Sequence, residues 1–227
     1  MNKTITAFLL SLGVAVSAQA EWKFGIGTGL GVFDIDGDLE IDGGETDLEY
    51  DVGDIESAFG LNGYAANGPW LIKASGSYLE VEADQDIKGG GTADDLNYER
   101  TNLELTVTYT FYEENAWKFG LLGGARYVEQ EFSVKSGPST DDDFIDAVIG
   151  ATASYMFAEN WAWVSTVDAS FGDSEGVYGL QTGVNWRFAE RWSTSAVFSY
   201  ESWEYEGDDF ESEADEIALS LGIMFHF

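Results

Sequence analysis

The fold is decided by the last eleven residues of the chain, Ile217-Ala218-Leu219-Ser220-Leu221-Gly222-Ile223-Met224-Phe225-His226-Phe227. Every second residue counted back from Phe227 is large and apolar, and most of the alternate positions hold small or polar residues. Successive side chains of a β-strand point to opposite faces, so this pattern predicts a strand with one apolar face. A tilted strand crosses a bilayer in roughly 9–11 residues, so the stretch is long enough to span a membrane.

The beginning of the chain has the three parts of a secretory signal peptide. Lys3 precedes an apolar run from Ile5 to Val16, and the small-residue pattern Ala18-Gln19-Ala20 follows. A membrane helix needs about 20 apolar residues, more than this run supplies. We therefore predict a signal peptide over residues 1–20, cleaved after Ala20, and a single mature domain over residues 21–227.

The composition restricts how the mature domain could cross a membrane. No stretch after residue 20 is apolar for long enough to form a transmembrane helix, yet the chain has 8 Trp, 11 Tyr, 15 Phe and 27 Gly. In lipid, strands leave no backbone group unpaired only when they close into a barrel. The formal net charge of −32 argues against nucleic acid or anionic lipid as a ligand. The chain has no cysteine, which fits an exported protein that does not rely on disulfides.

The alternation of the terminal stretch recurs along the whole chain. It is clearest between residues 102 and 111, where Leu103, Leu105, Val107, Tyr109 and Phe111 alternate with Asn102, Glu104, Thr106, Thr108 and Thr110. We count ten such segments, joined by four short turns and five mostly longer acidic loops. Short turns at one end and long loops at the other are typical of outer-membrane barrels. The sequence therefore predicts an all-β fold, a closed antiparallel up-and-down transmembrane β-barrel of ten strands, with eight strands as the alternative.

Aromatic residues recur where the short turns meet the strands. A Trp begins each strand that leaves a turn, and a Phe ends several of the strands that enter one. Such rings gather at membrane interfaces, whereas a soluble β-sandwich, the other fold that alternates in this way, needs no aromatic band. The predicted periplasmic band consists of Trp22, Trp70, Phe111, Trp117, Phe157, Trp161, Phe188 and Trp192.

With these features the chain resembles the bacterial outer-membrane β-barrel proteins, in the broad sense of small barrels of the OmpA and OmpX kind. Ile223, Phe225 and Phe227 match the terminal pattern that marks such chains for assembly. The resemblance implies a location in the outer membrane and a monomeric barrel. It also implies outer-membrane lipid, lipopolysaccharide and the assembly machinery as partners.

Charged residues on the inward face predict a polar lumen. Lys23, Lys118 and Arg187 lie beside the aromatic band, and the inward acids lie farther from it. Barrels of eight strands are filled by side chains and open pores need about 16, so a barrel of ten strands favours a plug of paired charges over a narrow channel for small solutes. The predicted lumen network consists of Lys23, Lys73, Arg100, Glu104, Lys118, Arg126, Asp146, Asp168, Arg187 and Glu201.

The sequence offers little for catalysis. Ten strands are also the number in the omptin proteases, but these use an Asp-His pair at the extracellular rim, and the only histidine here is His226 at the opposite end. An omptin-like or lipid-modifying enzyme is therefore the third alternative, behind a non-enzymatic barrel with a structural or surface-interaction role and a narrow channel. No catalytic, cofactor or metal residue is predicted.

The acidic segments raise the question of calcium. Asp34-Ile35-Asp36-Gly37-Asp38-Leu39-Glu40 places carboxylates at alternate positions but lacks the glycine spacing of an EF-hand loop. The alternation is better explained by the first strand continuing beyond the membrane. As a secondary hypothesis, the acidic loops together could bind Ca²⁺ from the medium and bridge to lipopolysaccharide phosphates.

Overall fold

The structure, a computed structural model, describes residues 22–41, 44–85, 94–134, 139–207 and 210–227. The predicted signal peptide lies outside this part of the chain. The elements are β1 (Lys23–Ile41), β2 (Gly44–Tyr50), η2 (Val52–Asp54), β3 (Ile55–Asn67), β4 (Trp70–Gln85), β5 (Asp94–Glu114), β6 (Trp117–Val134), β7 (Ser139–Ala158), β8 (Trp161–Gly172), β9 (Gly176–Ala189), β10 (Trp192–Glu206) and β11 (Phe210–His226). None of the helical segments described is long and apolar enough to cross a membrane.

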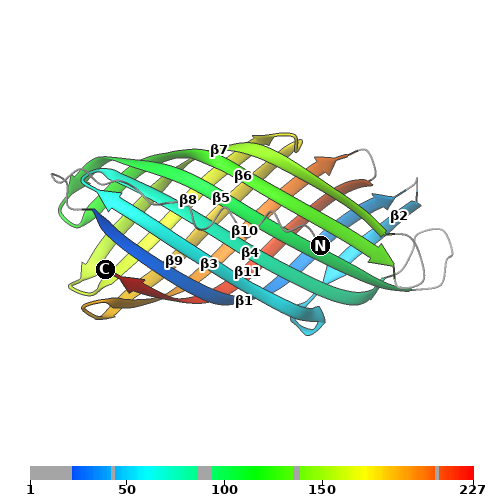
Figure 1. The fold of residues 1–227 in the computed structure, drawn as a ribbon, viewed down its shortest axis with the longest axis horizontal. Coiled ribbons are helices and arrows are strands. Elements are labelled where there is room, and N and C mark those ends of the chain that lie inside the picture. Colours follow the sequence, from blue (N-terminus) through cyan, green and yellow to red (C-terminus); the bar gives the residue numbers. More distant parts are fainter. Residues whose placement is uncertain (1–21, 42–43, 86–93, 135–138, 208–209) are drawn as a thin grey trace.

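The strands form one closed antiparallel barrel (Figure 1). Each strand from β3 to β10 pairs with the next along the chain, and β11 pairs with β1. β2 and β3 share one position in the wall, on the same edge of β1. β2 pairs with residues 35–41 of β1, and β3 pairs with residues 23–29. Counting β2 and β3 as one position gives ten strands, so the prediction of a closed ten-stranded barrel is confirmed.

The two ends of the barrel differ in their connections. The beginning of β1 and the C-terminus lie at the end where the short turns gather, on the left in Figure 1. Following the asymmetry of outer-membrane barrels, we name this end periplasmic and the other end extracellular. The turn between β3 and β4 is made by Gly68, with a positive φ of 54°, and Pro69. A two-residue pattern of positive φ occurs at Asn115 (55°) and Ala116 (87°), between β5 and β6.

Three of the periplasmic hairpins carry a β-bulge, which the sequence did not predict. The pairing shifts between Thr110 and Tyr112, between Met156 and Ala158, and next to the β9–β10 turn. The extra residues of the first two are Phe111 and Phe157, both members of the predicted aromatic band. A bulge re-aims the side chains around it, and both Phe111 and its neighbour Tyr112 are exposed on the outside.

The strands continue well beyond the membrane, with reversed polarity. On β1 the exposed outer positions Leu30 and Val32 are followed by exposed Asp34 and Asp36, while Ile35 next to them is buried inside. Large parts of the expected acidic loops are therefore strand, which corrects the prediction. The sequence in these parts keeps the period of two, and only the face that carries the apolar residues has changed.

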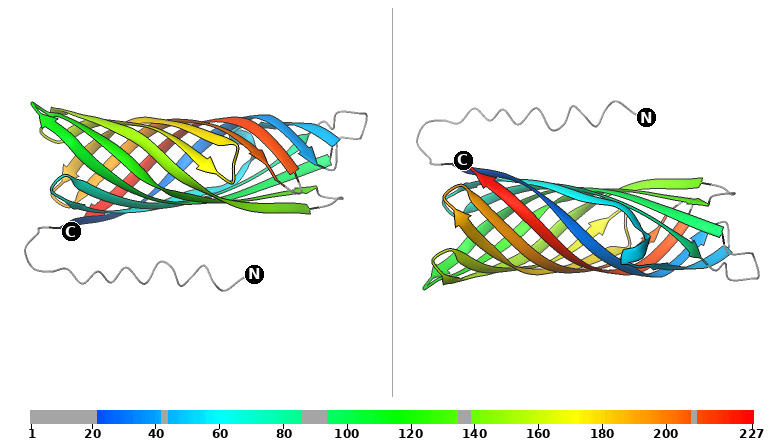
Figure 2. Two further views of the ribbon diagram at one scale, coloured as in Figure 1. Left: turned by 90° about the horizontal axis from the view of Figure 1, so that it is seen from above. Right: turned by 90° about the horizontal axis from the view of Figure 1, so that it is seen from below.

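The hydrophobic core lies inside the extracellular part of the barrel. Its members are apolar side chains from the inward positions of nine strands. They are Ile35, Leu39, Leu48, Tyr50, Leu79, Val81, Leu96, Tyr98, Val128, Phe132, Phe144, Val177, Trp203, Tyr205, Phe210 and Ala214. Figure 2 shows the barrel wall from two further sides. The barrel exposes apolar side chains on its outer face near the periplasmic end, and buries apolar side chains in its lumen at the other end.

Candidate functional site

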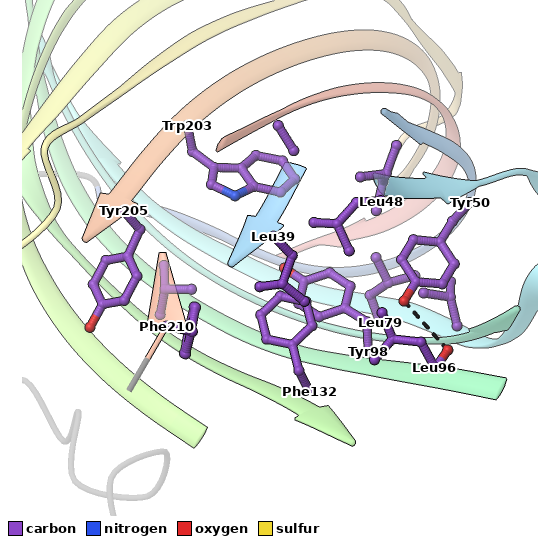
Figure 3. Close-up of a cluster of buried hydrophobic side chains, with 14 of the residues drawn as sticks. Leu39, Leu48, Tyr50, Leu79, Leu96, Tyr98, Phe132, Trp203, Tyr205 and Phe210 are labelled. Atoms are coloured by element: carbon purple, nitrogen blue, oxygen red, sulfur yellow. Dashed lines mark hydrogen bonds between the residues drawn. The ribbon is translucent and has the colours of Figure 1, made fainter. Parts of the chain in front are cut away.

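The extracellular lumen is crossed by a continuous series of aromatic rings, which we call the aromatic plug. Its rings are Tyr50, Tyr98, Phe132, Phe210, Tyr205 and Phe144, with successive centroids 6.2, 4.7, 5.1, 5.2 and 4.9 Å apart. Phe132 on β6 and Phe210 on β11 belong to strands that are not neighbours in the wall, so their edge-to-face contact spans the lumen. Figure 3 shows the rings of Tyr50, Tyr98, Phe132, Phe210 and Tyr205 inside the barrel.

Polar contacts hold the aromatic plug in place. The Tyr205 hydroxyl donates to Asp142 Oδ2 across the lumen at 2.6 Å, and the Tyr50 hydroxyl donates to the Leu96 carbonyl at 3.4 Å (Figure 3). Burial raises the pKa of both Tyr50 and Tyr98, so these phenols stay neutral at physiological pH. Aromatic and aliphatic side chains of the core are buried together at this level of the lumen.

Beneath the aromatic plug, Arg126 gathers three carboxylates. Its Nη2 lies 3.1 Å from Glu104 Oε2 and 3.3 Å from Asp168 Oδ1, and its Nη1 lies 3.0 Å from Glu201 Oε2. These residues come from β5, β6, β8 and β10, so the cluster links four strands. A planar guanidinium with five donors suits this task, because it can serve several carboxylates at once.

Arg100 makes a second, connected cluster. Its Nη2 donates to Glu216 Oε2 at 2.5 Å, its Nη1 lies 3.7 Å from Glu201 Oε1, and its guanidinium carbon lies 5.0 Å from the Trp203 ring centroid. Glu201 therefore bridges the two arginines, and Trp203 joins the charged layer to the core above it. Glu216 was missing from the predicted network, although its position one residue before Ile217 places it on the inward face.

Asp146 was placed in the lumen network, and the structure gives it a different set of partners. It faces Arg126 in the register of β6 and β7 and is 0% exposed, but its hydrogen bonds come from serines. Ser170 Oγ donates to Asp146 at 3.1 Å, and Ser174 donates through its backbone nitrogen at 3.1 Å and through its hydroxyl at 2.5 Å. Asp146 thus fixes the connection between β8 and β9.

The remaining predicted cations lie in the lumen, in the case of Lys73, and at its periplasmic mouth. Lys73 lines the lumen and acts electrostatically on Asp168. Lys23, Lys118 and Arg187 are exposed near the periplasmic mouth, and Lys118 Nζ lies 2.7 Å from Glu113 Oε1 in a solvent-exposed pair. Pairs of this kind contribute little to stability, about 0–1 kcal/mol.

The single histidine forms a serine–histidine pair that the sequence did not predict. His226 Nε2 lies 2.9 Å from Ser193 Oγ, and His226 Nδ1 lies 2.8 Å from the Tyr64 hydroxyl. Ser193 is only 1% exposed, so a substrate cannot reach its hydroxyl. The close approach of Tyr64 requires glycine at residue 25, because a Cβ there would lie 2.3 Å from Tyr64 Cε1. The arrangement ties β3, β10 and β11 together at the periplasmic end.

The residues of the predicted aromatic band lie around the periplasmic end, and several stack on a second row. Trp70 packs on Tyr109 at 4.8 Å, and Trp161 packs on Trp186 at 5.3 Å. Further contacts join Trp22 to Phe24, Trp117 to Tyr155, Phe157 to Trp161, Trp186 to Phe188, and Trp192 to Phe225. Phe225 also contacts Phe227, so the terminal strand joins the band.

Outside the core, the strand extensions carry facing carboxylates, which we call the acidic collar. Cross-strand partners include Asp36 with Asp215, Asp38 with Glu213, Glu40 with Glu211, Glu206 with Glu211, Glu129 with Asp143, and Glu131 with Asp141. The seven residues from Asp34 to Glu40 are strand, as the sequence analysis favoured. In the part of the chain that the structure describes, no group of three or more His, Asp or Glu side chains is arranged to hold a metal ion.

A cavity of about 410 Å³ lies between the charged layer and the wall formed by β1, β3, β4 and β11. Its polar lining includes Arg100, Arg126, Glu104, Asp168, Glu201 and Glu216, with Asn62, Asn102 and several serines. Its apolar lining includes Leu30, Phe59, Leu61 and Leu221. The lining ends at Asn62 and Lys73 toward the periplasm, short of the layer that holds Tyr64 and His226.

Comparison with known proteins agrees with this architecture. The sequence matches the model of the outer membrane protein beta-barrel domain over residues 4–227. The chain belongs to this family. Its membership places the protein in the outer membrane and confirms the resemblance inferred from the terminal strand. A search of curated protein sequences gave no match.

Several solved structures are similar to this chain in fold at low sequence identity. The outer membrane protease OmpT from Escherichia coli has a TM-score of 0.64 at 11% identity, over 93% of this chain and 99% of that chain. The translocator domain of the autotransporter NalP from Neisseria meningitidis has a TM-score of 0.47 at 14% identity, over 95% and 91%. The attachment invasion locus protein Ail of Yersinia pestis has a TM-score of 0.41 at 14% identity, over 90% and 98%. At these identities the likeness concerns the fold alone.

Proposed function

We propose that this protein is a non-enzymatic outer-membrane barrel that is closed to solutes and holds the acidic collar at the cell surface for interaction or structural support. The observation that carries the proposal is the aromatic plug, whose ring contacts cross the extracellular lumen between strands that are not neighbours in the wall. Two ion-paired arginine clusters lie directly beneath it. A hydrated ion entering from outside would meet an apolar layer first and paired charges next.

The geometry also supports the non-enzymatic part of the proposal. The serine–histidine pair lies at the periplasmic end, and its serine is buried. A general base must reach the proton that it takes from the nucleophile while the substrate is bound, and no substrate can contact Ser193 without opening the barrel. The buried serine–histidine pair therefore does not support a hydrolase function.

Planar-bilayer recording of the purified, folded protein tests closure. We expect no conductance steps from the wild-type protein. The double variant Phe132→Ala/Phe210→Ala, which removes the ring contact across the lumen, should show steps, because the plug then has a gap. Discrete ion-selective steps from the wild type would overturn the proposal, and their loss on Lys118→Ala or Arg187→Ala would establish the narrow channel instead.

A further inference from the structure

The wall of the barrel is interrupted between β1 and β3. The ladder that joins these strands ends at Gly29 and Gly60, and β1 is paired again on that side only from Ile35, by β2. Residues 30–34 of β1 therefore pair only with β11, and residues 55–59 of β3 pair only with β4. The Thr28 hydroxyl donates to the Gly60 carbonyl at 2.8 Å at the end of the ladder.

The path of the chain explains the interruption. After β2 the backbone leaves the wall, makes the short turn η2, and returns as β3 on the other side of the gap (Figure 1). Asp51 caps this turn by accepting from the backbone nitrogen of Gly53, and Asp54 accepts from that of Asp51. The excursion is thus an ordered part of the fold.

The cavity reaches this gap. Its lining includes residues on both edges of the gap, Leu30, Gly31 and Phe33 on β1 and Phe59 and Gly60 on β3, together with Arg100 and Arg126 in the lumen. Leu30 and Phe59 are 68% and 51% exposed. The cavity therefore extends to the stretch where no ladder joins β1 to β3, and we call it the side pocket.

The gap lies at the depth of the outer leaflet. Leu30 is eight residues from Trp22 in the aromatic band. This separation corresponds to a height of about 20 Å for a rise of about 3.3 Å per residue and a tilt of about 40°. The apolar zone of such barrels is about 25 Å tall, and the first outward acid on β1 is Asp34. Unpaired strand edges at this depth are costly in lipid unless a polar group meets them.

The lining points to the chemistry of the occupant. Neutral hydrogen-bonding residues, among them Asn62, Ser75, Ser77 and Asn102, line the polar part together with the charged residues. The carboxylates Glu104, Asp168, Glu201 and Glu216 outnumber the cations Lys73, Arg100 and Arg126, and both arginines are already paired. Asn102 Oδ1 is buried and has no hydrogen-bond partner among the described residues, so it is an acceptor available to a hydroxyl.

We propose that this side pocket binds a single-chain amphiphile with an uncharged, hydroxyl-bearing headgroup, which enters from the outer leaflet between β1 and β3. The headgroup lies against Asn102 and the neighbouring serines, and the hydrocarbon chain leaves over Leu30, Phe59 and Leu61. A volume of about 410 Å³ falls in the usual range for small-ligand pockets, about 300–1,000 Å³. The inference rests on the proposed closure, because the plug leaves the lipid as the route of entry.

Two matched glycine variants test the pocket. A Cβ at Gly60 would meet only the Gly76 carbonyl, at 3.7 Å, and one at Gly63 only the Gly25 carbonyl, at 3.5 Å. Both sites therefore accept a side chain, but only Gly60 lines the cavity. Gly60→Leu should fill the mouth of the pocket, and Gly63→Leu is its control on the same strand.

The measurement is equilibrium binding of radiolabelled 1-decanoylglycerol to the full-length folded protein in phosphatidylcholine nanodiscs, with empty nanodiscs as background. We expect saturable binding of one molecule per barrel, at least tenfold weaker for Gly60→Leu and unchanged for Gly63→Leu. Asn102→Ala, which removes the acceptor without filling the pocket, should also weaken binding and decides the question if Gly60→Leu does not fold.

Several outcomes would overturn the inference. They are no saturable binding above empty nanodiscs, equal binding by both leucine variants, and tighter binding of decanoate or decyltrimethylammonium than of the uncharged probe. The bilayer recording separates this inference from the proposed function. Conductance steps together with intact binding of the probe would reject only the proposed closure of the barrel. The absence of both conductance steps and probe binding would reject only the pocket.

Discussion

Arg126 is the residue on which the charged layer depends most. It donates to Glu104 and Glu201, and its Nη2 also reaches Asp168, all within 3.3 Å. A buried charge that loses its partner costs more than the pair contributed, because the remaining group cannot recover its hydration. Arg126 therefore stabilises the fold mainly because it prevents the free-energy cost of leaving these carboxylates buried and unpaired.

We expect Arg126→Ala to lower the free energy of unfolding by about 3–5 kcal/mol, the usual cost of breaking a buried ion pair. Urea unfolding of the protein in lipid vesicles measures this. Adding Glu104→Gln and Asp168→Asn to Arg126→Ala should recover part of the loss, since the unpaired carboxylates are then neutral. Equal stability of Arg126→Ala and wild type would show that the carboxylates find other partners.

At the scale of the elements, the strand extensions hold together against their own charge. Directly opposed like charges destabilise a sheet, and the acidic collar opposes carboxylates on several adjacent strands. The inner faces of the same strands bury the core, whose members include Leu39, Phe132 and Phe210. Burial of a large apolar side chain contributes about 1.5–3 kcal/mol, more than an exposed pair of like charges costs.

The same substitution on the two faces of β11 should have opposite effects. Glu211 is exposed and faces Glu40 and Glu206, so Glu211→Gln should raise the melting temperature at low salt. Glu216 is buried against Arg100, so Glu216→Gln should lower it. The gain from Glu211→Gln should disappear near 1 M NaCl, where the screening length is about 3 Å. A gain that survives high salt, or the same sign for both variants, would contradict this account.

The period of two predicts the strands and the direction in which their side chains point, and it predicts Arg126, Glu104, Asp168 and Glu201 as neighbours in one lumen. The alternation also predicted that the first strand continues beyond the membrane, but the other acidic segments were predicted as loops. Ile35 and Leu39 alternate with acids in the first extension, which indicates an inward apolar face beyond the membrane. The contact of Phe132 with Phe210 and the gap between β1 and β3 could not be predicted, because alternation fixes a face but neither the register of a ladder nor the residues opposite across a lumen.

At the scale of the whole molecule, the barrel is closed by one seam. β1 and β11 pair from Gly25 with His226 to Ile41 with Phe210, along nearly their full lengths. This ladder is far longer than that between β1 and β3, which runs only from Lys23 with Ala66 to Gly29 with Gly60. The wall can therefore remain open beside β3 because the other edge of β1 is paired throughout.

Phe227 ends this seam, and we expect its removal to impair assembly more than stability. Its backbone nitrogen donates to the Phe24 carbonyl at 3.0 Å, and its carbonyl accepts from the Phe24 nitrogen at 3.3 Å. Deletion removes two hydrogen bonds, each of about 0.5–1.5 kcal/mol, from a long ladder, but also removes the exposed terminal ring. Refolding into vesicles without cellular factors should therefore remain close to wild type.

In cells, the folded fraction should fall severalfold for the deletion and stay unchanged for Phe227→Tyr. Heat-modifiable gel mobility and surface protease accessibility measure this fraction. An unchanged folded fraction in cells after the deletion would remove Phe227 from the assembly signal, and failure to refold in vesicles would make its role structural.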